Sequence, residues 1–346
     1  MLASALAGQY ALVIDARSQR EYTEDHVPSA VNLPVVDNEE YAEVGTTHRT
    51  DKHRAYLIGV SYALKNISHA IDDLVAGHPK DARMLVLLLP RGQAQRVVVR
   101  RALHHRIPSG SPSGRLEGVP GVGQRSVDRT PRKFRFHVLC GPTGCGKTRL
   151  LSALATVGAQ VLDLEALARH RGSLIGDIPD MGQPTQKWFE SQLVDALRRF
   201  DPEKPMWVES ESKKIGAIQL PGALLEAMRD ARVFAVSAPM SERVQLWRED
   251  YAHFERDPDA LIERLRHLRP LIGGEEFAHW ESLAKERRMP ELFQRLMEAH
   301  YDPAYGHSIR KNYPLIEDAA KVDLRRLDGD SLLEAARQLH EEPATV

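Results

Sequence analysis

Eight residues near the middle of the chain constrain its fold more than any other feature of the sequence. They read Gly141-Pro-Thr-Gly-Cys-Gly-Lys-Thr148 and satisfy the pattern G-x-x-x-x-G-K-[ST] in full. A stretch typical of a buried strand precedes them at Phe134 to Leu139, and a helical pattern follows from Lys147 to about Val157. This strand–loop–helix context predicts a phosphate-binding P-loop at the start of an α/β domain.

The residue types of this loop suit phosphate chemistry. Glycines let backbone N–H groups turn inward on an anion, and the N-terminus of the following helix adds positive charge. Lys147 is expected to reach terminal phosphates, and the Thr148 hydroxyl is expected to ligate Mg²⁺ if the substrate carries one. Cys145 is expected to contribute its backbone, with a catalytic thiol as the alternative. The predicted phosphate-binding residues are Gly141, Thr143, Gly144, Cys145, Gly146, Lys147 and Thr148.

Strands and helices alternate after the P-loop. The patterns predict strands at Gln160 to Leu164, Pro205 to Glu209 and Arg232 to Ser237, with helices at Thr185 to Phe200 and Leu224 to Arg229. Such alternation is typical of a parallel sheet covered on both faces, so we expect a three-layer α/β domain over residues 134–346. The part from Ser241 on is mostly helical.

Polar residues near the ends of these strands are candidates for supporting the phosphate site, since ligands of open α/β sheets bind there. Two carboxylates follow an apolar strand, the position from which a second ligand could reach Mg²⁺. A basic stretch, Arg169 to Ser173, could form a lid over the phosphates or be plain surface. The candidates for anion or metal support are Asp163, Arg171, Ser173, Glu209, Glu211, Lys213 and Arg243.

The composition limits the classes of protein to which this chain can belong. Lys and Arg number 47 against 48 Asp and Glu, so a nucleic-acid partner must be held by a local patch instead of a global field. The two cysteines, Cys140 and Cys145, exclude a disulfide framework and fit a reducing cytoplasm. No apolar run is long enough to cross a bilayer, so we expect a cytoplasmic protein without a membrane partner.

The N-terminal part, residues 1–130, forms a second region. Ala11 to Asp15 and Val31 to Pro34 are typical of strands, Tyr56 to Ala76 of a helix, and Met84 to Leu89 of a buried parallel strand. Residues 91–133 are dense in Gly, Pro and Arg and lose any period past about Leu103, which is also the composition of a linker.

Two sets of segments together resemble one family. The start of a rhodanese domain resembles two segments, Ile14 to Ser18 and His26 to Pro34. The second domain of bacterial tRNA 2-selenouridine synthases resembles the P-loop together with Leu162-Asp-Leu-Glu165, His170-Arg-Gly-Ser173 and Glu209 to Gly216. The resemblance implies a rhodanese-like parallel-sheet domain followed by the P-loop domain. It also implies a transferase that replaces the sulfur of 2-thiouridine in tRNA with selenium from selenophosphate, through an S-geranyl intermediate made from geranyl diphosphate.

This chain departs from the family at the rhodanese loop, where a nucleophilic Cys is expected near Leu88. Leu87 to Gln95 instead reads Leu-Leu-Leu-Pro-Arg-Gly-Gln-Ala-Gln. Codons chosen for these residues, read one nucleotide later, encode Tyr-Cys-Ser-Arg-Gly-Gly-Lys-Arg-Ser, which is the missing loop. His104 to Gly110, shifted in the same way, gives Thr-Ile-Gly-Phe-Arg-Val. We therefore predict that residues 88–115 are out of frame, poorly packed, and leave the N-terminal sheet incomplete.

Two function hypotheses follow, and a third, that the whole chain is a pseudogene product, follows if the frameshift is genuine. The first is a tRNA-modifying transferase with a damaged selenium-transfer loop, which uses selenophosphate and geranyl diphosphate as substrates, Mg²⁺ as an optional ion, and no permanently bound cofactor. The second is a P-loop kinase or NTPase with an inert rhodanese-like binding module. ATP turnover without tRNA would favour the second.

Overall fold

The structure is a computed structural model that describes residues 11–70, 83–88, 96–101, 127 and 130–341. The chain divides into two compact units, one comprising Met1–Val127 with Thr185–Arg199 and the other Asp128–Pro184 with Phe200–Val346. The division falls close to the boundary at residue 130 that the sequence predicts, although the segment Thr185–Arg199 groups with the first unit.

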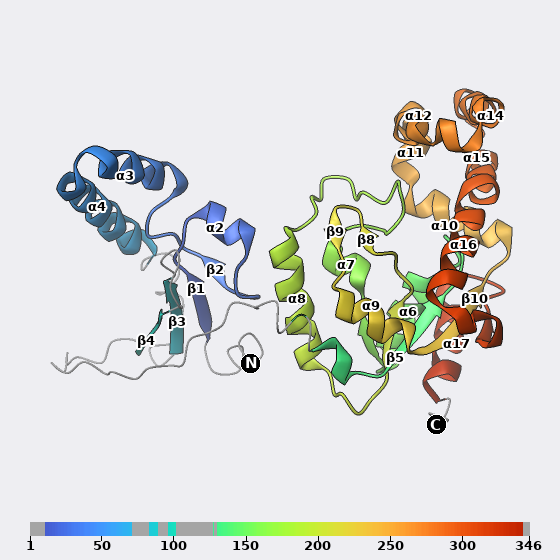
Figure 1. Ribbon diagram of the computed structural model, residues 1–346, viewed down its shortest axis with the longest axis horizontal. Coiled ribbons are helices and arrows are strands. Elements are labelled where there is room, and N and C mark those ends of the chain that lie inside the picture. Colours follow the sequence, from blue (N-terminus) through green and yellow to red (C-terminus); the bar gives the residue numbers. More distant parts are fainter. Residues whose placement is uncertain (1–10, 71–82, 89–95, 102–126, 128–129, 342–346) are drawn as a thin grey trace. The chain divides into compact units, whose positions relative to one another are not determined.

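The first unit contains a sheet of four described strands in the order β2-β1-β3-β4 (Figure 1). Its strands are β1 (Leu12–Asp15), β2 (Val31–Asn32), β3 (Arg83–Leu88) and β4 (Arg96–Arg101). Its helices are α2 (Gln19–Glu24), α3 (Asn38–Thr50), α4 (Lys52–Ala70) and α8 (Gln186–Arg199). The sequence patterns therefore locate β1, β2, β3, α4 and α8, with ends that differ by a few residues.

One strand of this sheet corrects the prediction of a parallel N-terminal sheet. β1 pairs in parallel with both β2 and β3, but β4 runs antiparallel to β3, with Leu85 opposite Val99. Only seven residues, 89–95, join β3 to β4. A parallel pair needs a crossover of about a dozen residues or more, so a connection this short imposes the antiparallel direction.

Residues of the rhodanese-like motif stabilise the end of β1. Asp15 is fully buried and pairs with the Arg17 guanidinium at 2.6 Å. The same guanidinium donates to the Asp25 carbonyl, and the Asn32 side chain donates to the carbonyls of Asp15 and Arg17. These motif residues thus fasten the turns around β1 to one another.

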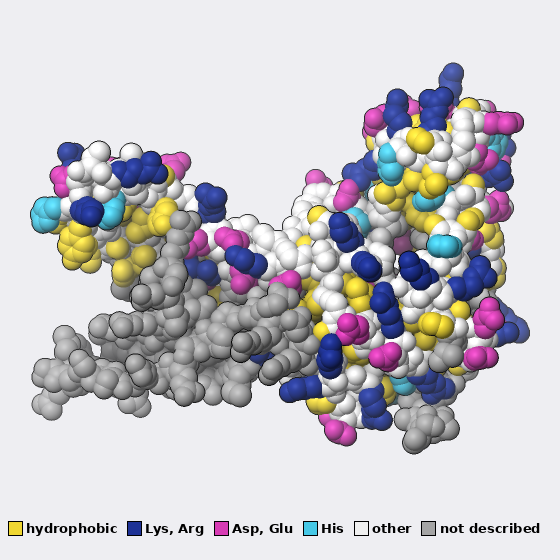
Figure 2. Space-filling view, viewed as in Figure 1, with side chains coloured by type: hydrophobic (Ala, Val, Ile, Leu, Met, Phe, Trp, Pro, Cys, Tyr) yellow, Lys and Arg dark blue, Asp and Glu magenta, His cyan; other side chains and the backbone are white. Residues whose placement is uncertain are grey.

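Helices α3 and α4 pack against each other, and the sequence patterns did not predict α3. A capping box starts this helix, because the Asp37 carboxylate accepts from Glu40 N–H while the Glu40 carboxylate accepts from Asp37 N–H. Large apolar side chains gather on the outside of the pair (Figure 2). The most exposed are Tyr56 at 68%, Leu64 at 66% and Leu57 at 54%.

The second unit is built on a parallel five-stranded sheet in the order β11-β10-β5-β7-β6. The strands are β5 (Phe136–Cys140), β6 (Gln160–Leu162), β7 (Met206–Glu209), β10 (Arg232–Ser237) and β11 (Ala320–Asp323). Helices α6 (Lys147–Thr156) and α17 (Gly329–Glu341) share one apolar cluster with Leu139, Trp207 and Phe234, while α9 (Gly222–Arg229) also contacts β5. This arrangement confirms the predicted α/β architecture.

Short elements complete the sheet connections. They are η2 (Pro131–Lys133), α7 (Leu164–Ala168) and the two-stranded hairpin β8 (Lys214–Ile215) with β9 (Ile218–Gln219). The predicted strand Gln160 to Leu164 is too long, because β6 ends at Leu162 and Asp163 caps α7 by accepting from Ala166 N–H. β11 was not predicted, since Val322 is the one buried residue among its four.

The expected helical part follows β10 and has its own buried core around Trp247, Phe277, Trp280 and Phe293. Its elements are α10 (Met240–Asp250), α11 (Ala252–Arg256), α12 (Pro258–Leu265), η3 (Arg266–Leu268), α13 (Arg269–Ile272), α14 (Gly274–Lys285), α15 (Met289–Leu296), the π-helical turn η4 (Met297–Tyr301), α16 (Asp302–Asn312) and η5 (Pro314–Asp318). Among the described residues, no helix combines the length and apolar character that crossing a membrane requires.

Candidate functional site

The P-loop joins the end of β5 to the start of α6, as the sequence predicts. Gly146 caps α6 in the left-handed conformation, with φ at +85°. A Cβ at this position would lie 2.6 Å from the Leu327 side chain, so glycine is required both for the turn and for the close packing. The N-terminus of α6 follows this turn directly, and the backbone N–H groups of its first turn can bind an anion there.

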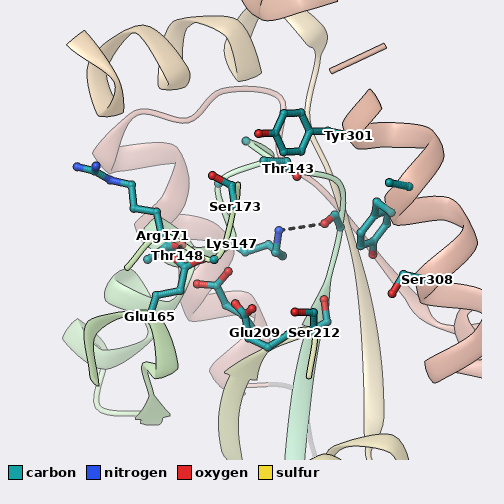
Figure 3. Close-up of a pocket in the computed structure, with 18 of the residues that line it drawn as sticks. Thr143, Lys147, Thr148, Glu165, Arg171, Ser173, Glu209, Ser212, Tyr301 and Ser308 are labelled. Atoms are coloured by element: carbon teal, nitrogen blue, oxygen red, sulfur yellow. Dashed lines mark hydrogen bonds between the residues drawn. The ribbon is translucent and has the colours of Figure 1, made fainter. Parts of the chain in front are cut away.

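A cavity of about 460 Å³ opens over the loop. Its floor is the P-loop, and its walls come from the segments after β6 and β7, from α10 and from α16 (Figure 3). The lining includes Gly141, Thr143, Gly144, Gly146, Lys147, Thr148, Glu165, Arg171, Gly172, Ser173, Glu209, Ser210, Glu211, Leu246, Trp247, Tyr251, His300, Tyr301, Tyr305, Ser308, Ile309, Asn312 and Tyr313.

Lys147 lies at the centre of this cavity. Its Nζ donates to the Gly141 carbonyl at 2.9 Å and contacts the Pro142 carbonyl at 3.4 Å (Figure 3). Burial opposes its charge, but the nearby Cys145 thiol and the neighbouring carboxylates outweigh burial and raise the pKa of Lys147. The Lys147 side chain thus stays positively charged and donates hydrogen bonds to the backbone of its own loop.

Three carboxylates converge beside this lysine. Glu165 comes from α7, Glu209 from the end of β7, and Glu211 from the loop that follows, and one oxygen of each lies within 4.8 Å of the others. Burial first, and then mutual repulsion, raise the pKa of Glu165 well above its usual range. Burial and the Glu209 charge raise the pKa of Glu211 to about 8. The surroundings of the cluster therefore disfavour ionisation of all three carboxylates at once.

The donor set fits a hard divalent cation such as Mg²⁺, which prefers carboxylate and hydroxyl oxygens. Glu209 is buried, and its Oε1 has no hydrogen-bond partner among the described residues, which marks an unsatisfied acceptor inside the cluster. The Thr148 hydroxyl lies 3.5 Å from Glu165 Oε2, on the side where the P-loop begins its helix. Thr148 thus lies where the sequence places a metal-binding hydroxyl.

The loop after α7 covers the carboxylates. Gly172 has φ at +66°, and a Cβ there would lie 2.4 Å from Glu165 Oε1 and 3.3 Å from Glu211 Oε2. The next residue, Ser173, shares a hydrogen bond of 2.9 Å with the Tyr251 hydroxyl. Arg171 stacks its guanidinium over the Tyr251 ring at 5.5 Å, and its buried Nη1 has no hydrogen-bond partner among the described residues. This segment lines the cavity, at the position for which the sequence leaves a lid and plain surface as alternatives.

Aromatic rings form the wall opposite the carboxylates. Trp247 meets Tyr251 and Tyr301 edge to face, with ring centroids 5.2 and 5.1 Å apart. The Tyr301 hydroxyl is buried and has no hydrogen-bond partner in the described part of the chain, although it borders the cavity. The cavity thus combines a charged floor with an aromatic and apolar wall.

Several sequence-predicted residues lie outside the cavity lining. Asp163 caps α7, and Lys213 is an exposed residue of the loop before β8. Arg243 is buried, donates to the Thr143 carbonyl at 2.8 Å and pairs with Asp302 through two bonds. Its position therefore makes it a support for the loop backbone instead of a ligand for the anion.

The Cys145 thiol is fully buried, and burial raises its pKa, as it raises that of Cys140 to about 12. Burial thus opposes formation of the thiolate, the nucleophilic form, at both positions.

Sequence reasoning missed Glu165, Tyr251 and Tyr301 as site residues. Glu165 carried a usable signal, since it lies two residues after a carboxylate at a strand end, in the segment that resembles the family. Tyr251, between α10 and α11, also lies in a segment that resembles the family, Glu249 to Phe254, whereas Tyr301 carried no signal, because it belongs to η4 far along the chain.

The structure also describes Leu88, near which the resemblance implies the rhodanese nucleophile. Leu88 is the last residue of β3, at its carboxyl end. The rest of the predicted out-of-frame segment lies outside the described residues, apart from Arg96–Arg101, which form β4.

Comparisons with known proteins agree on one family. Residues 134–264 match the model of a family described as the tRNA 2-selenouridine synthase AAA domain. A tRNA 2-selenouridine synthase of Nitrosomonas europaea is 31% identical over 274 residues, covering 76% of this chain and 68% of that protein. One of Cronobacter sakazakii is 30% identical over 374 residues and covers 94% of both chains. A third, of Hahella chejuensis, is 29% identical and covers 90% of this chain and 89% of that protein.

Proposed function

The chain belongs to the tRNA 2-selenouridine synthase family, and from that premise we propose that it is a transferase that modifies 2-thiouridine at the wobble position of tRNA. The P-loop unit would transfer a geranyl group from geranyl diphosphate to the uridine sulfur. Selenium from selenophosphate would then replace the geranylated sulfur.

The cavity over the P-loop is the observation that carries this proposal. Its floor offers the loop backbone and Lys147 to a diphosphate, and Trp247 and Ile309 offer apolar surface to a prenyl chain. A prenyl diphosphate would use both surfaces, its phosphates on the floor and its hydrocarbon chain against the wall. The aromatic rings also suit stacking of a splayed-out base, the usual way in which proteins read single-stranded RNA.

In the transfer step, the uridine sulfur attacks C1 of geranyl diphosphate. A carbon–sulfur bond forms, the carbon–oxygen bond to the diphosphate breaks, the diphosphate leaves with the electron pair, and the uridine N3 loses its proton to the solvent. The charge that grows on the leaving oxygen lies over the P-loop amides and Lys147, and fixed donors aimed at developing charge lower the barrier. Mg²⁺, held by Thr148 and the nearby carboxylates, would further neutralise the leaving diphosphate.

The selenium step is the weaker half of the activity in this chain. Residues 1–133 contain no cysteine, so the N-terminal unit lacks the thiol that the family resemblance implies near Leu88. We therefore expect geranyl transfer without efficient formation of 2-selenouridine.

The test is to incubate the purified chain with tRNA carrying 2-thiouridine and geranyl diphosphate, and to analyse the nucleosides by mass spectrometry. S-geranyl-2-thiouridine should form with the wild type and with Lys213→Ala, whose side chain is exposed outside the cavity, but not with Lys147→Ala. Absence of the product from the wild type, together with ATP turnover that needs no tRNA, would replace this proposal by a P-loop kinase or NTPase.

A further inference from the structure

Helices α3 and α4 form an antiparallel hairpin. The Tyr62 hydroxyl donates to the Glu43 carboxylate at 2.6 Å, and the Asn66 side chain donates to the Glu40 carboxylate at 2.7 Å. Later residues of α4 therefore lie beside earlier residues of α3, which places the joining residue, Asp51, at one end of the pair. The two acids of α3 are thus engaged along the body of the hairpin, away from that end.

The tip of this hairpin, which comprises residues 48–54, is strongly basic. It reads His-Arg-Thr-Asp-Lys-His-Arg, so three cations and two histidines accompany a single carboxylate. That carboxylate, Asp51, accepts from the Arg54 N–H at 2.9 Å at the start of α4. All seven residues are exposed, and Lys, Arg and His side chains gather over the two helices (Figure 2). The tip therefore presents positive charge to the solvent.

The stability of the hairpin does not account for these cations. None of Arg49, Lys52 and Arg54 forms an ion pair with a carboxylate in the described part of the chain. Arg49 suits the negative end of the α3 dipole, but Lys52 and Arg54 lie in the first turn of α4, where the positive end of a helix dipole repels a cation. Cations in such a place fit an anion that comes from outside the chain.

An exposed aromatic side chain lies beside the tip. Tyr56 is 68% exposed, and it follows Lys52 by four residues and His53 by three, so its ring lies on the same side of the helix as both. Proteins bind single-stranded nucleic acid with such a combination, because cations attract the phosphates and a ring stacks on a base. The net charge of the whole chain is −1, so a nucleic acid must be bound by a local patch of this kind.

We propose that the hairpin tip binds the tRNA substrate, with Arg49, Lys52 and Arg54 on backbone phosphates and the Tyr56 ring against an unpaired base. The identity of this ligand rests on the proposed function, but the inference does not depend on the chemistry in the P-loop cavity. Contacts to phosphates carry no sequence information, so the tip positions the tRNA and leaves recognition of the modified uridine to the cavity.

An anionic membrane is the competing partner, because α4 also exposes Leu57 and Leu64. A helix that lies on a membrane carries its cations along the polar face. Between Arg54 and the end of α4, however, the sequence has one further cation, Lys65. The charge is thus concentrated at one end of the helix, which favours a phosphate backbone that crosses the tip.

Binding of fluorescently labelled tRNA that carries 2-thiouridine, measured by anisotropy with the full chain at several salt concentrations, tests the proposal. Replacing the three tip cations by alanine should weaken binding at least about tenfold. It should also reduce the slope of log affinity against log salt by about two, since each lost phosphate contact contributes about 0.7–0.9. The charge-matched control replaces three exposed cations of the P-loop unit, Lys285, Lys321 and Arg325, by alanine and should bind like the wild type.

The outcomes separate this inference from the proposed function. Wild-type binding that the tip substitutions leave unchanged, or equal losses in the two triple variants, would overturn the inference and leave the proposed function standing. No tRNA binding by the wild type would overturn both. Melting curves that match the wild type show that the variants fold.

Two further measurements test the aromatic contact and the class of partner. Tyr56→Leu should weaken tRNA binding about fivefold or more without changing the salt slope, whereas Tyr56→Phe keeps the ring and the affinity. Equal binding by both Tyr56 variants would remove the stacking contact. Vesicles of phosphatidylglycerol should not compete with tRNA. Vesicles that bind as tightly as tRNA, and lose that binding when the tip cations are replaced, would assign the tip to a membrane and overturn the proposal.

Discussion

The two units of the molecule differ in how completely their functional loops are present. In the P-loop unit, the loop, the carboxylates and the lid surround one cavity, and buried aromatic and aliphatic side chains support them. In the N-terminal unit, β1 and its motif residues are in place, but the strand that should lead into the nucleophilic loop ends at Leu88 without a cysteine.

The two units also differ in how completely they bury their large apolar side chains. Trp207, Trp247 and Trp280 are almost fully buried in the P-loop unit, whereas α4 exposes Tyr56, Leu57 and Leu64. The relative from Cronobacter sakazakii aligns over 94% of both chains, so the N-terminal unit belongs to the family's arrangement. If residues 88–115 are out of frame, the comparison predicts that such a change leaves the P-loop site intact, because that site has its own core.

The largest expected difference between the two units is the formation of a selenium adduct, which is either present or absent. After incubation with selenophosphate, mass spectrometry should find no selenium adduct between residues 1 and 133, because that part has no thiol. A chain in which residues 87–95 are replaced by Tyr-Cys-Ser-Arg-Gly-Gly-Lys-Arg-Ser should gain one when a disulfide is added as the two-electron oxidant that a sulfur–selenium bond requires.

An adduct on Cys145 would contradict the view that this buried thiol, with its raised pKa, is inert. The nucleotide sequence across codons 80–125 is the direct check of the frameshift. An uninterrupted reading frame that matches the printed residues and no shifted frame would remove that hypothesis.

Lys147→Ala should abolish most binding of geranyl diphosphate. Such a loss would show that the P-loop unit binds this ligand without help from the N-terminal unit. The variant loses a charged hydrogen-bond donor but keeps the backbone turn, and such a bond contributes about 1.5–3 kcal/mol, or about 10- to 100-fold in affinity. Calorimetry with geranyl diphosphate and Mg²⁺ measures the loss, with Lys213→Ala as the control. Unchanged affinity in Lys147→Ala would mean that the ligand binds elsewhere.

Arg243→Met should destabilise the P-loop unit by about 3 kcal/mol, since it leaves the Asp302 carboxylate and the Thr143 carbonyl without their buried partner. We take the lower end of the usual range because Asp302 is about a third exposed. This corresponds to about 6–12 °C in Tm.

Differential scanning calorimetry, which resolves transitions of separate units, is the measurement. Arg248→Met removes an exposed pair with Glu255 and should shift the transition by less than about 1 kcal/mol. Equal effects of the two substitutions would show that Arg243 does not support the loop.

Gly172→Ala should weaken Mn²⁺ binding about tenfold, because its Cβ would push against Glu165 Oε1. Gly158→Ala is the matched control, since Gly158 also has a positive φ, +92°, but nothing lies within 4 Å of its Cβ position. Both variants bear the backbone strain, so a loss in both would assign the effect to strain and not to contact with the carboxylates.

The smallest expected effect is a dependence of stability on pH. The pKa of Glu211 is raised to about 8 in the folded chain, above its ordinary value of 4.5, so the folded state binds more protons between these values. The metal-free protein should therefore lose stability as pH rises from about 5 to about 8, by at least about 2 °C in Tm. Glu211→Gln should flatten this dependence, and Mg²⁺ should reverse it by binding the ionised form. A Tm that rises with pH in the wild type without metal would contradict the raised pKa.

Much of the site could be predicted from short stretches of sequence. The loop Gly141 to Thr148 was located to the residue, because its glycine spacing and its position between a strand and a helix are local properties of the chain. Glu209 was correctly placed at the end of its strand, since a continuous apolar run marks a buried parallel strand and a carboxylate marks where it leaves the core. Even α3 had a local signal, the capping box at Asp37 and Glu40, which was overlooked.

The sequence by itself thus determined where the chain turns on a phosphate, which class of domain contains that turn, and that the N-terminal unit has no thiol. Only the tertiary structure decided that Glu165 joins Glu209 and Glu211, that Arg243 supports the loop from behind, and that Tyr251 and Tyr301 wall the cavity. The reason is physical. Backbone turns and apolar periods depend on neighbours in sequence, whereas these contacts join residues many positions apart, which meet only once the strand order and the helical packing bring them together.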